Sequence, residues 1–107
     1  MFALVMINGD TDWKGRTSVE CKLIETAKFY TLLDLKIPEL TQQMLEEYRN
    51  EEKAEHNQKR SHMLGHGEED IGKWDVSKSA YWLCDKVVCG KWDGNYAFSK
   101  YQVIRIE

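Results

Sequence analysis

The chain opens with an uninterrupted apolar run from Phe2 to Ile7, which ends at Asn8-Gly9-Asp10. Such a run has the length of a strand, and the absence of alternating polar residues is typical of a strand covered on both faces. The next segment, 8–16 (NGDTDWKGR), is rich in turn-forming residues. The pattern therefore predicts a buried first strand followed by a loop.

Residues 17–33 carry a pattern that predicts a helix. Thr17 and Glu20 stand at the spacing of a capping box, in which a hydroxyl precedes a glutamate by three residues. Apolar residues then recur at spacings of four and three, at Val19, Leu23, Ala27, Tyr30 and Leu33, with Ile24 beside them. We interpret this segment as a helix with one buried face that ends near Leu33.

A second helix is predicted to begin at Pro38, because the first turn of a helix tolerates a residue without an N–H group. Its buried stripe consists of Leu40, Met44, Leu45 and Tyr48. From 49 to 62 (RNEEKAEHNQKRSH) the only apolar residue is Ala54. A helix that is polar all round bridges solvent, binds a partner or frays. Gly65-His66-Gly67 predicts its end.

The C-terminal part predicts strands. Residues 80–89 (AYWLCDKVVC) are rich in aromatic and β-branched side chains, Asp93-Gly94 supplies a turn, and 98–106 alternate in polarity. The first strand should pair with this hairpin, since a lone hairpin is marginal in water. The predicted fold is α+β, in the order β-α-α-β-β: a single domain over 1–107 with two helices on one face of a small, mostly antiparallel sheet. The polar segment 49–70 should project from the core.

Composition narrows the class of protein. A chain of 107 residues with 42% hydrophobic and 31% charged residues fits one globular domain. The net charge of −3 disfavours nucleic acid as a partner, because its binders usually carry a basic excess. No signal peptide and no apolar stretch of roughly 18 residues is present, so we expect a cytoplasmic protein without a membrane partner. The three cysteines are then expected to be buried free thiols.

A zinc site is the sharpest chemical hypothesis. Its candidate ligands are His62, His66, Cys84 and Cys89. Zinc prefers nitrogen and sulfur ligands, often two from each of two segments. The cysteine spacing argues against it, because Cys84 and Cys89 would face opposite sides of a straight strand. They converge only if the segment 85–88 turns, and that segment lacks glycine and proline.

Catalysis has weaker support. His56, His62 and His66 with Glu68, Glu69 and Asp70 supply groups for general acid–base or metal-assisted hydrolysis. A polar helix and a glycine-flanked loop are poor places to exclude water, and no established catalytic motif is present. Cys21, on a helix predicted to face the core, should be inert. The sequence leaves an enzyme open but favours a protein without turnover.

Tryptophans in turns suggest binding. Trp13 and Trp92 each stand in a predicted turn beside a lysine, whereas Trp82 is expected in the core. The leading hypothesis is a small binding module, monomeric or homodimeric, that acts stoichiometrically on a protein partner as a regulator or inhibitor; phage and mobile-element accessory proteins offer an analogy. Its expected contact residues are Trp13, Tyr48, Arg49, Glu52, Glu55, His56, Lys59, Arg60 and Trp92.

Two alternatives remain. The first is a nucleic-acid-associated domain in which the hairpin aromatics stack on bases beside Lys91, Lys100 and Arg105. The second is a zinc-binding domain or metal-dependent hydrolase built on the histidines and cysteines named above.

Overall fold

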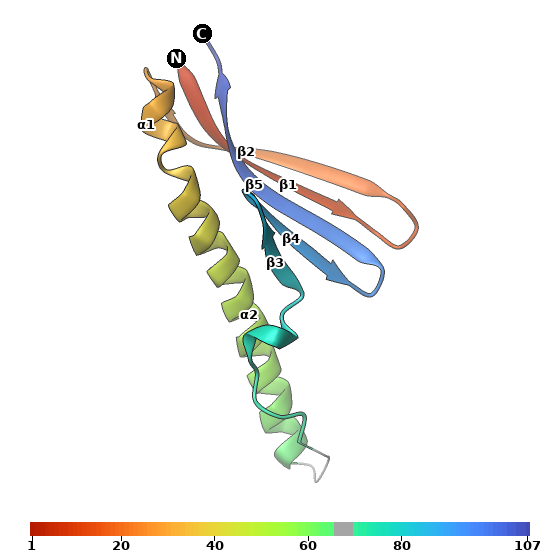
Figure 1. Ribbon diagram of the computed structural model, residues 1–107. Coiled ribbons are helices and arrows are strands. Elements are labelled where there is room, and N and C mark those ends of the chain that lie inside the picture. The colour runs from red at the N-terminus through yellow and green to blue at the C-terminus, as the bar shows by residue number, and fades with distance from the viewer. Residues whose placement is uncertain (66–69) are drawn as a thin grey trace.

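The computed structural model describes residues 1–65 and 70–107, of which 64 and 65 are described by their backbone only. A five-stranded antiparallel sheet of order β2-β1-β5-β4-β3 lies beside two consecutive helices (Figure 1). The elements are β1 (Phe2–Thr11), β2 (Thr17–Ala27), α1 (Tyr30–Asp34), α2 (Ile37–Gly65), the 3-10 helix η1 (Val76–Lys78), β3 (Tyr81–Cys84), β4 (Val87–Trp92) and β5 (Asn95–Arg105). The α+β class is confirmed, as is the pairing of the first strand with the C-terminal hairpin.

The prediction of a helix over 17–33 is wrong for most of its length, because residues 17–27 form β2. Val19 and Leu23 are four residues apart, and this spacing places them on one side of a strand as well as of a helix. Polar Ser18, Glu20 and Lys22 alternate with apolar residues, which is the period of a half-buried strand. Only the last part of the predicted segment is helical, as the short α1.

The predicted strand over 80–89 is divided into β3 and β4 by a turn at Asp85-Lys86. Asp85 adopts a positive φ of 57°, which an aspartate tolerates better than most residues and which no glycine signalled in the sequence. The Asp93-Gly94 turn is confirmed, with φ angles of 47° and 80°.

The first half of α2 packs on the sheet as predicted. Pro38 lies in its first turn, and Met44 and Leu45 are buried against Val88. A second cluster joins Leu33 and Ile37 to Leu4 of β1. Both clusters lie on the same face of the sheet, so the helices cover one face only (Figure 1).

The expectation that the first strand is covered on both faces is therefore met only in part. Phe2, Leu4 and Met6 point toward the helices. Ala3 and Val5 point the other way, between the neighbouring strands β2 and β5, and are 1% and 5% exposed. No described helix covers that second face.

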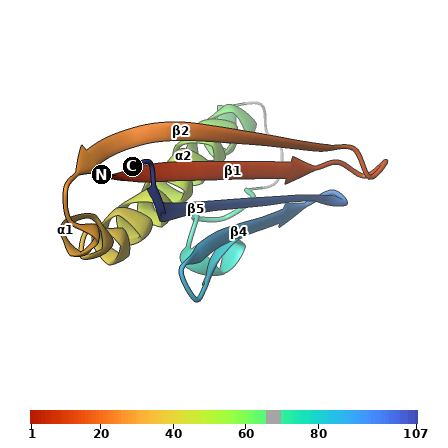
Figure 2. The same cartoon turned by 90° about the horizontal axis from the view of Figure 1, so that it is seen from above.

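The molecule is elongated. Its radius of gyration is 17.6 Å and its extents are 61 × 31 × 20 Å, whereas a compact chain of this length has a radius of about 13 Å. Two features cause this: the second half of α2 runs past the sheet, and the β1–β2 and β4–β5 hairpins extend away from α2 (Figures 1 and 2). The chain thus exposes much of the apolar surface that its sheet carries.

Candidate functional site

The face of the sheet opposite the helices is the candidate site, and we call it the uncovered face. Antiparallel register places side chains of all five strands in rows across it. One row is Trp82, Cys89, Phe98, Gly9 and Val19. The next row is Cys84, Val87, Lys100, Ile7 and Cys21. Gly9 allows the row to pack flat, because a Cβ there would lie 2.1 Å from Phe98 Cε1.

Apolar side chains dominate the uncovered face. Val19 and Leu23 of β2 are 61% and 60% exposed, and Trp82 of β3 is 43% exposed. Monomeric proteins rarely expose contiguous apolar patches of this kind, and larger patches mark sites of interaction. The surface extends from the β2 edge of the sheet to the β3 edge.

The charges of this face have one sign. Lys91 and Lys100 lie on it, by their register opposite Tyr96 and Ile7. The Lys91 ammonium stands 5.3 Å from the centre of the Tyr96 ring. No aspartate or glutamate of the five strands points to this side in the register, although the whole chain carries a net charge of −3.

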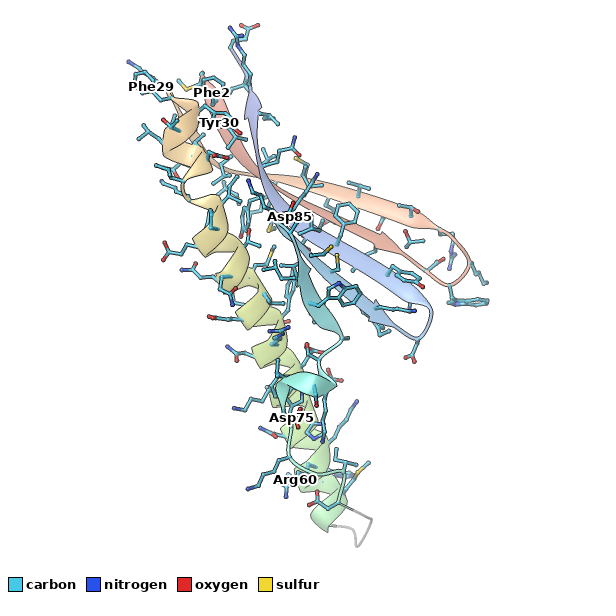
Figure 3. The ribbon with its side chains drawn as sticks, in the orientation of Figure 1. Phe2, Phe29, Tyr30, Arg60, Asp75 and Asp85 are labelled. Carbon is cyan, nitrogen blue, oxygen red and sulfur yellow. The ribbon has the colours of Figure 1, made fainter. Side chains whose placement is uncertain are left out.

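The polar half of α2 has a partner within the chain. Four of its side chains, one turn apart, hydrogen-bond to residues 70–81, which run back along the helix to the sheet. Arg49 donates to the Tyr81 carbonyl, and Glu52 accepts from the Ala80 N–H at 2.8 Å. The His56 ring contacts the Gly72 carbonyl. Arg60, which lies on the second half of α2 (Figure 3), donates two bonds to the Asp70 carboxylate. This set of contacts, which we call the polar strap, explains how a helix without an apolar stripe is held.

The remaining residues expected to contact a partner lie in several places. Glu55 and Lys59 form an exposed ion pair of 3.3 Å on α2. Trp13 is 70% exposed at the β1–β2 turn, where its backbone N–H donates to the Asn95 side-chain oxygen. Tyr48 bonds to Ser99, and Trp92 packs near Tyr81, both on the helix side of the sheet. The structure therefore does not gather the nine expected residues into one surface.

The strap should respond to acid through Asp70. The Arg60 guanidinium, followed by the Gly72 N–H, lowers the pKa of this carboxyl to about 2. Because this pKa is depressed in the folded state, the contact is fully present above the ordinary aspartate pKa of about 3.9 and is lost as the pH falls toward 2. We predict that carbon-detected NMR titration finds this low pKa, and that Arg60→Gln raises it partway because Gly72 still donates. An unchanged pKa in Arg60→Gln would contradict the assigned cause.

The cysteines differ from the prediction. All three are free, but Cys21 and Cys84 are exposed and only Cys89 is partly buried. Cys21 is exposed because its segment is an edge strand, not a core-facing helix. Cys84 and Cys89 share the uncovered face, not opposite sides, because the chain turns at Asp85. Burial, and then the neighbouring Cys84, raises the pKa of the Cys89 thiol.

Of the candidate zinc ligands that the structure describes, the two cysteines share a face, but His62 is not brought to them. His62 lies near the C-terminal end of α2, well away from the β3–β4 hairpin that carries the cysteines (Figure 1). His66, with Glu68 and Glu69 of the catalytic hypothesis, lies outside the described residues. Within 1–65 and 70–107, no three His, Cys, Asp or Glu side chains are arranged to hold a metal ion. The zinc hypothesis stays a prediction.

The uncovered face was missed by sequence reasoning. Its signal was present in β2, where Val19, Cys21 and Leu23 alternate with polar residues. Alternation on an edge strand, next to a first strand that is apolar on both sides, indicates a sheet with two apolar faces.

Comparison with protein-family models, with curated proteins and with solved structures finds no match to this chain. Any proposal about the function of this chain therefore rests on its sequence and structure alone. Of the helices in the described part of the chain, none is both long and apolar enough to cross a membrane, since the 29-residue α2 is polar along most of its length.

Proposed function

We propose that this protein is a non-catalytic protein-binding module that docks through the uncovered face of its sheet. The observation that carries the proposal is β1, whose residues from Phe2 to Ile7 are apolar toward both faces although the described part of the chain supplies helices for one. Strands of this composition are typical of sheets covered on both sides. A partner protein would supply the second cover.

The charges on the face favour a different protein over a second copy of this chain. If two copies paired through their uncovered faces, Lys91 and Lys100 of one copy would meet the same lysines of the other. The uncovered face of neither copy carries a strand carboxylate to offset these charges. Like charges across an interface are unfavourable. We therefore propose a partner with an apolar surface that carries acidic groups near its edge.

Stoichiometric binding of such a partner is how a small regulator or inhibitor acts, and we propose that role. A cytoplasmic location is part of the proposal. Two of the three free thiols are exposed, and exposed thiols persist in a reducing compartment.

The docking face can be tested by placing negative charges on its apolar surface. The double variant Val19→Glu, Leu23→Glu places carboxylates at two exposed positions of the uncovered face. The partner captured by tagged wild-type protein from native cells should be lost with this variant. A matched control, Gln42→Glu with Gln43→Glu, adds the same charge on the exposed side of α2 and should retain it. Equal capture by both variants would contradict the docking face.

Single-stranded nucleic acid is the second candidate, and one observation favours it. Trp82, Tyr96 and Phe98 share the uncovered face with Lys91 and Lys100, which is the combination used by stacking platforms. Arg105, the third expected cation, points to the other face. The same preparations should be titrated with oligonucleotides: binding that weakens steeply with salt and with Phe98→Ala would support this candidate, and no binding at low salt would remove it.

A further inference from the structure

A cleft of about 320 Å³ lies on the opposite side of the sheet from the uncovered face, between the sheet and α2. Of its lining residues, only Phe98 also belongs to the docking surface proposed above. Its size is at the lower end of the range for small-ligand sites and suits a flat head group with a short stem. Its lining comes from β1, β2, β3, β4 and β5 and from Tyr48 of α2.

Two rows of side chains form the floor of the cleft. Register pairs Asn8 with Glu20 on one side and Ser99 on the other. In the next row, Asp10 lies opposite Ala97, which pairs with Gly90. Two carboxylates and one amide thus project from neighbouring positions of β1 and β2 into the same space.

Aromatic rings form the wall on the other side. Tyr48, Tyr81 and Trp92 follow one another with ring centres 5.0 Å and 5.8 Å apart. Gly90 makes room for them, because a Cβ there would lie 2.8 Å from both Trp92 and Tyr81 ring atoms. The row therefore depends on the absence of a side chain at one position in the middle of β4.

The cleft is supplied with acceptors and lacks cations. No lysine or arginine lines it, and neither Asp10 nor Glu20 has an ion-pair partner among the described residues. The Asn8 Oδ1 atom is buried and has no hydrogen-bond donor within the part of the chain that the structure describes. Burial, and then nearby negative charges including Glu52 and Asp10, raises the pKa of Tyr81. An unpaired buried acceptor is costly, and a donor that reaches it would be stabilised.

We infer that this cleft binds an organic cation rich in N–H donors, with a guanidinium group as the best fit. Such a group donates to several acceptors at once, and its flat face stacks on tyrosine and tryptophan rings. Asp10 and Glu20 supply the opposite charge, Asn8 Oδ1 accepts an N–H, and the Tyr81 and Trp92 rings offer aromatic faces on which the plane stacks. The cation would come from a free small molecule or from an arginine side chain of a polypeptide.

The test is an NMR titration of the isotope-labelled full chain with butylguanidinium and with butylurea, which has the same shape but no charge. We expect saturable shifts of the amides near Asn8, Gly90 and Ala97 with the cation only. Asp10→Asn and Glu20→Gln should each weaken binding about tenfold, as expected for a lost charge-assisted hydrogen bond. Glu25→Gln removes the same charge from the same sheet face outside the cleft, where Glu25 pairs with Lys36, and should leave affinity unchanged.

One further ligand distinguishes the sources of the cation. A blocked Gly-Arg-Gly peptide that binds tighter than butylguanidinium indicates a polypeptide arginine, whereas a weaker peptide indicates a free small molecule. The absence of saturable shifts with both cations would overturn the inference. Equal shifts with butylurea, or equal affinity in the two cleft variants and wild type, would overturn it as well. Because the docking-face variants at Val19 and Leu23 lie on the other side of the sheet, they should bind butylguanidinium normally.

Discussion

Leu4→Ala is expected to lower the free energy of unfolding by about 2–5 kcal/mol, the range for removing a buried leucine side chain. Leu4 is fully buried, in a cluster with Leu33 and Ile37 that joins the first strand to both helices. The described core consists of small clusters of this kind, so few neighbours can move in to fill the space. Urea unfolding followed by far-ultraviolet circular dichroism measures the change.

Leu23→Ala is the matched control, since it removes the same atoms from the uncovered face. Leu23 is 60% exposed, and the isolated protein should lose no more than about 0.5 kcal/mol. A loss as large as that of Leu4→Ala would show that Leu23 is buried in solution. If that loss grew with protein concentration, a second copy would be the cover, and the proposal of a different partner protein would be wrong.

The largest error of the sequence prediction concerns β2, whose apolar residues fit the period of a helix as well as that of a strand. Pro38 and the apolar stripe from Leu40 to Tyr48 correctly predicted a helix. Together with the strands predicted at both ends of the chain, this helix led to the α+β class. Val19 and Leu23 fit the period of a helix and that of a strand. The capping-box spacing at Thr17 favoured the helix, which was wrong. Local patterns cannot resolve such a case, because strand pairing with β1 supplies the energy that selects the extended form.

The turn at Asp85 and the polar strap could not be predicted from local sequence patterns either. Asp85 takes a positive φ where aspartate is only one of several permitted residues, so its identity does not predict the turn. The strap joins α2 to residues 70–81 through polar contacts, which have no hydrophobic period to reveal them. Arg49, Glu52, His56 and Arg60 do recur one turn apart. In this chain, that spacing marks the side of α2 that bonds to residues 70–81.

Glu52→Ala is expected to release the end of the strap that meets the sheet. The Glu52 carboxylate accepts hydrogen bonds from the Ala80 N–H and from the Ser79 hydroxyl, at partly buried positions just before β3. Its loss leaves the Ala80 N–H without an acceptor, which costs about 1–3 kcal/mol. Hydrogen exchange of the amides from 79 to 81 should accelerate accordingly, while that of the β1 and β5 amides should change little.

Glu51→Ala provides the control, because it makes the same change of helix propensity and net charge at the neighbouring, exposed position of α2. Exchange at 79–81 should then remain as in wild type. Acceleration in both variants would mean that the charge of the helix, and not the Glu52 hydrogen bonds, holds the segment. Acceleration in Glu52→Ala alone would show that polar contacts anchor β3 to α2, which is what allows the second half of this helix to extend past the sheet without a hydrophobic core.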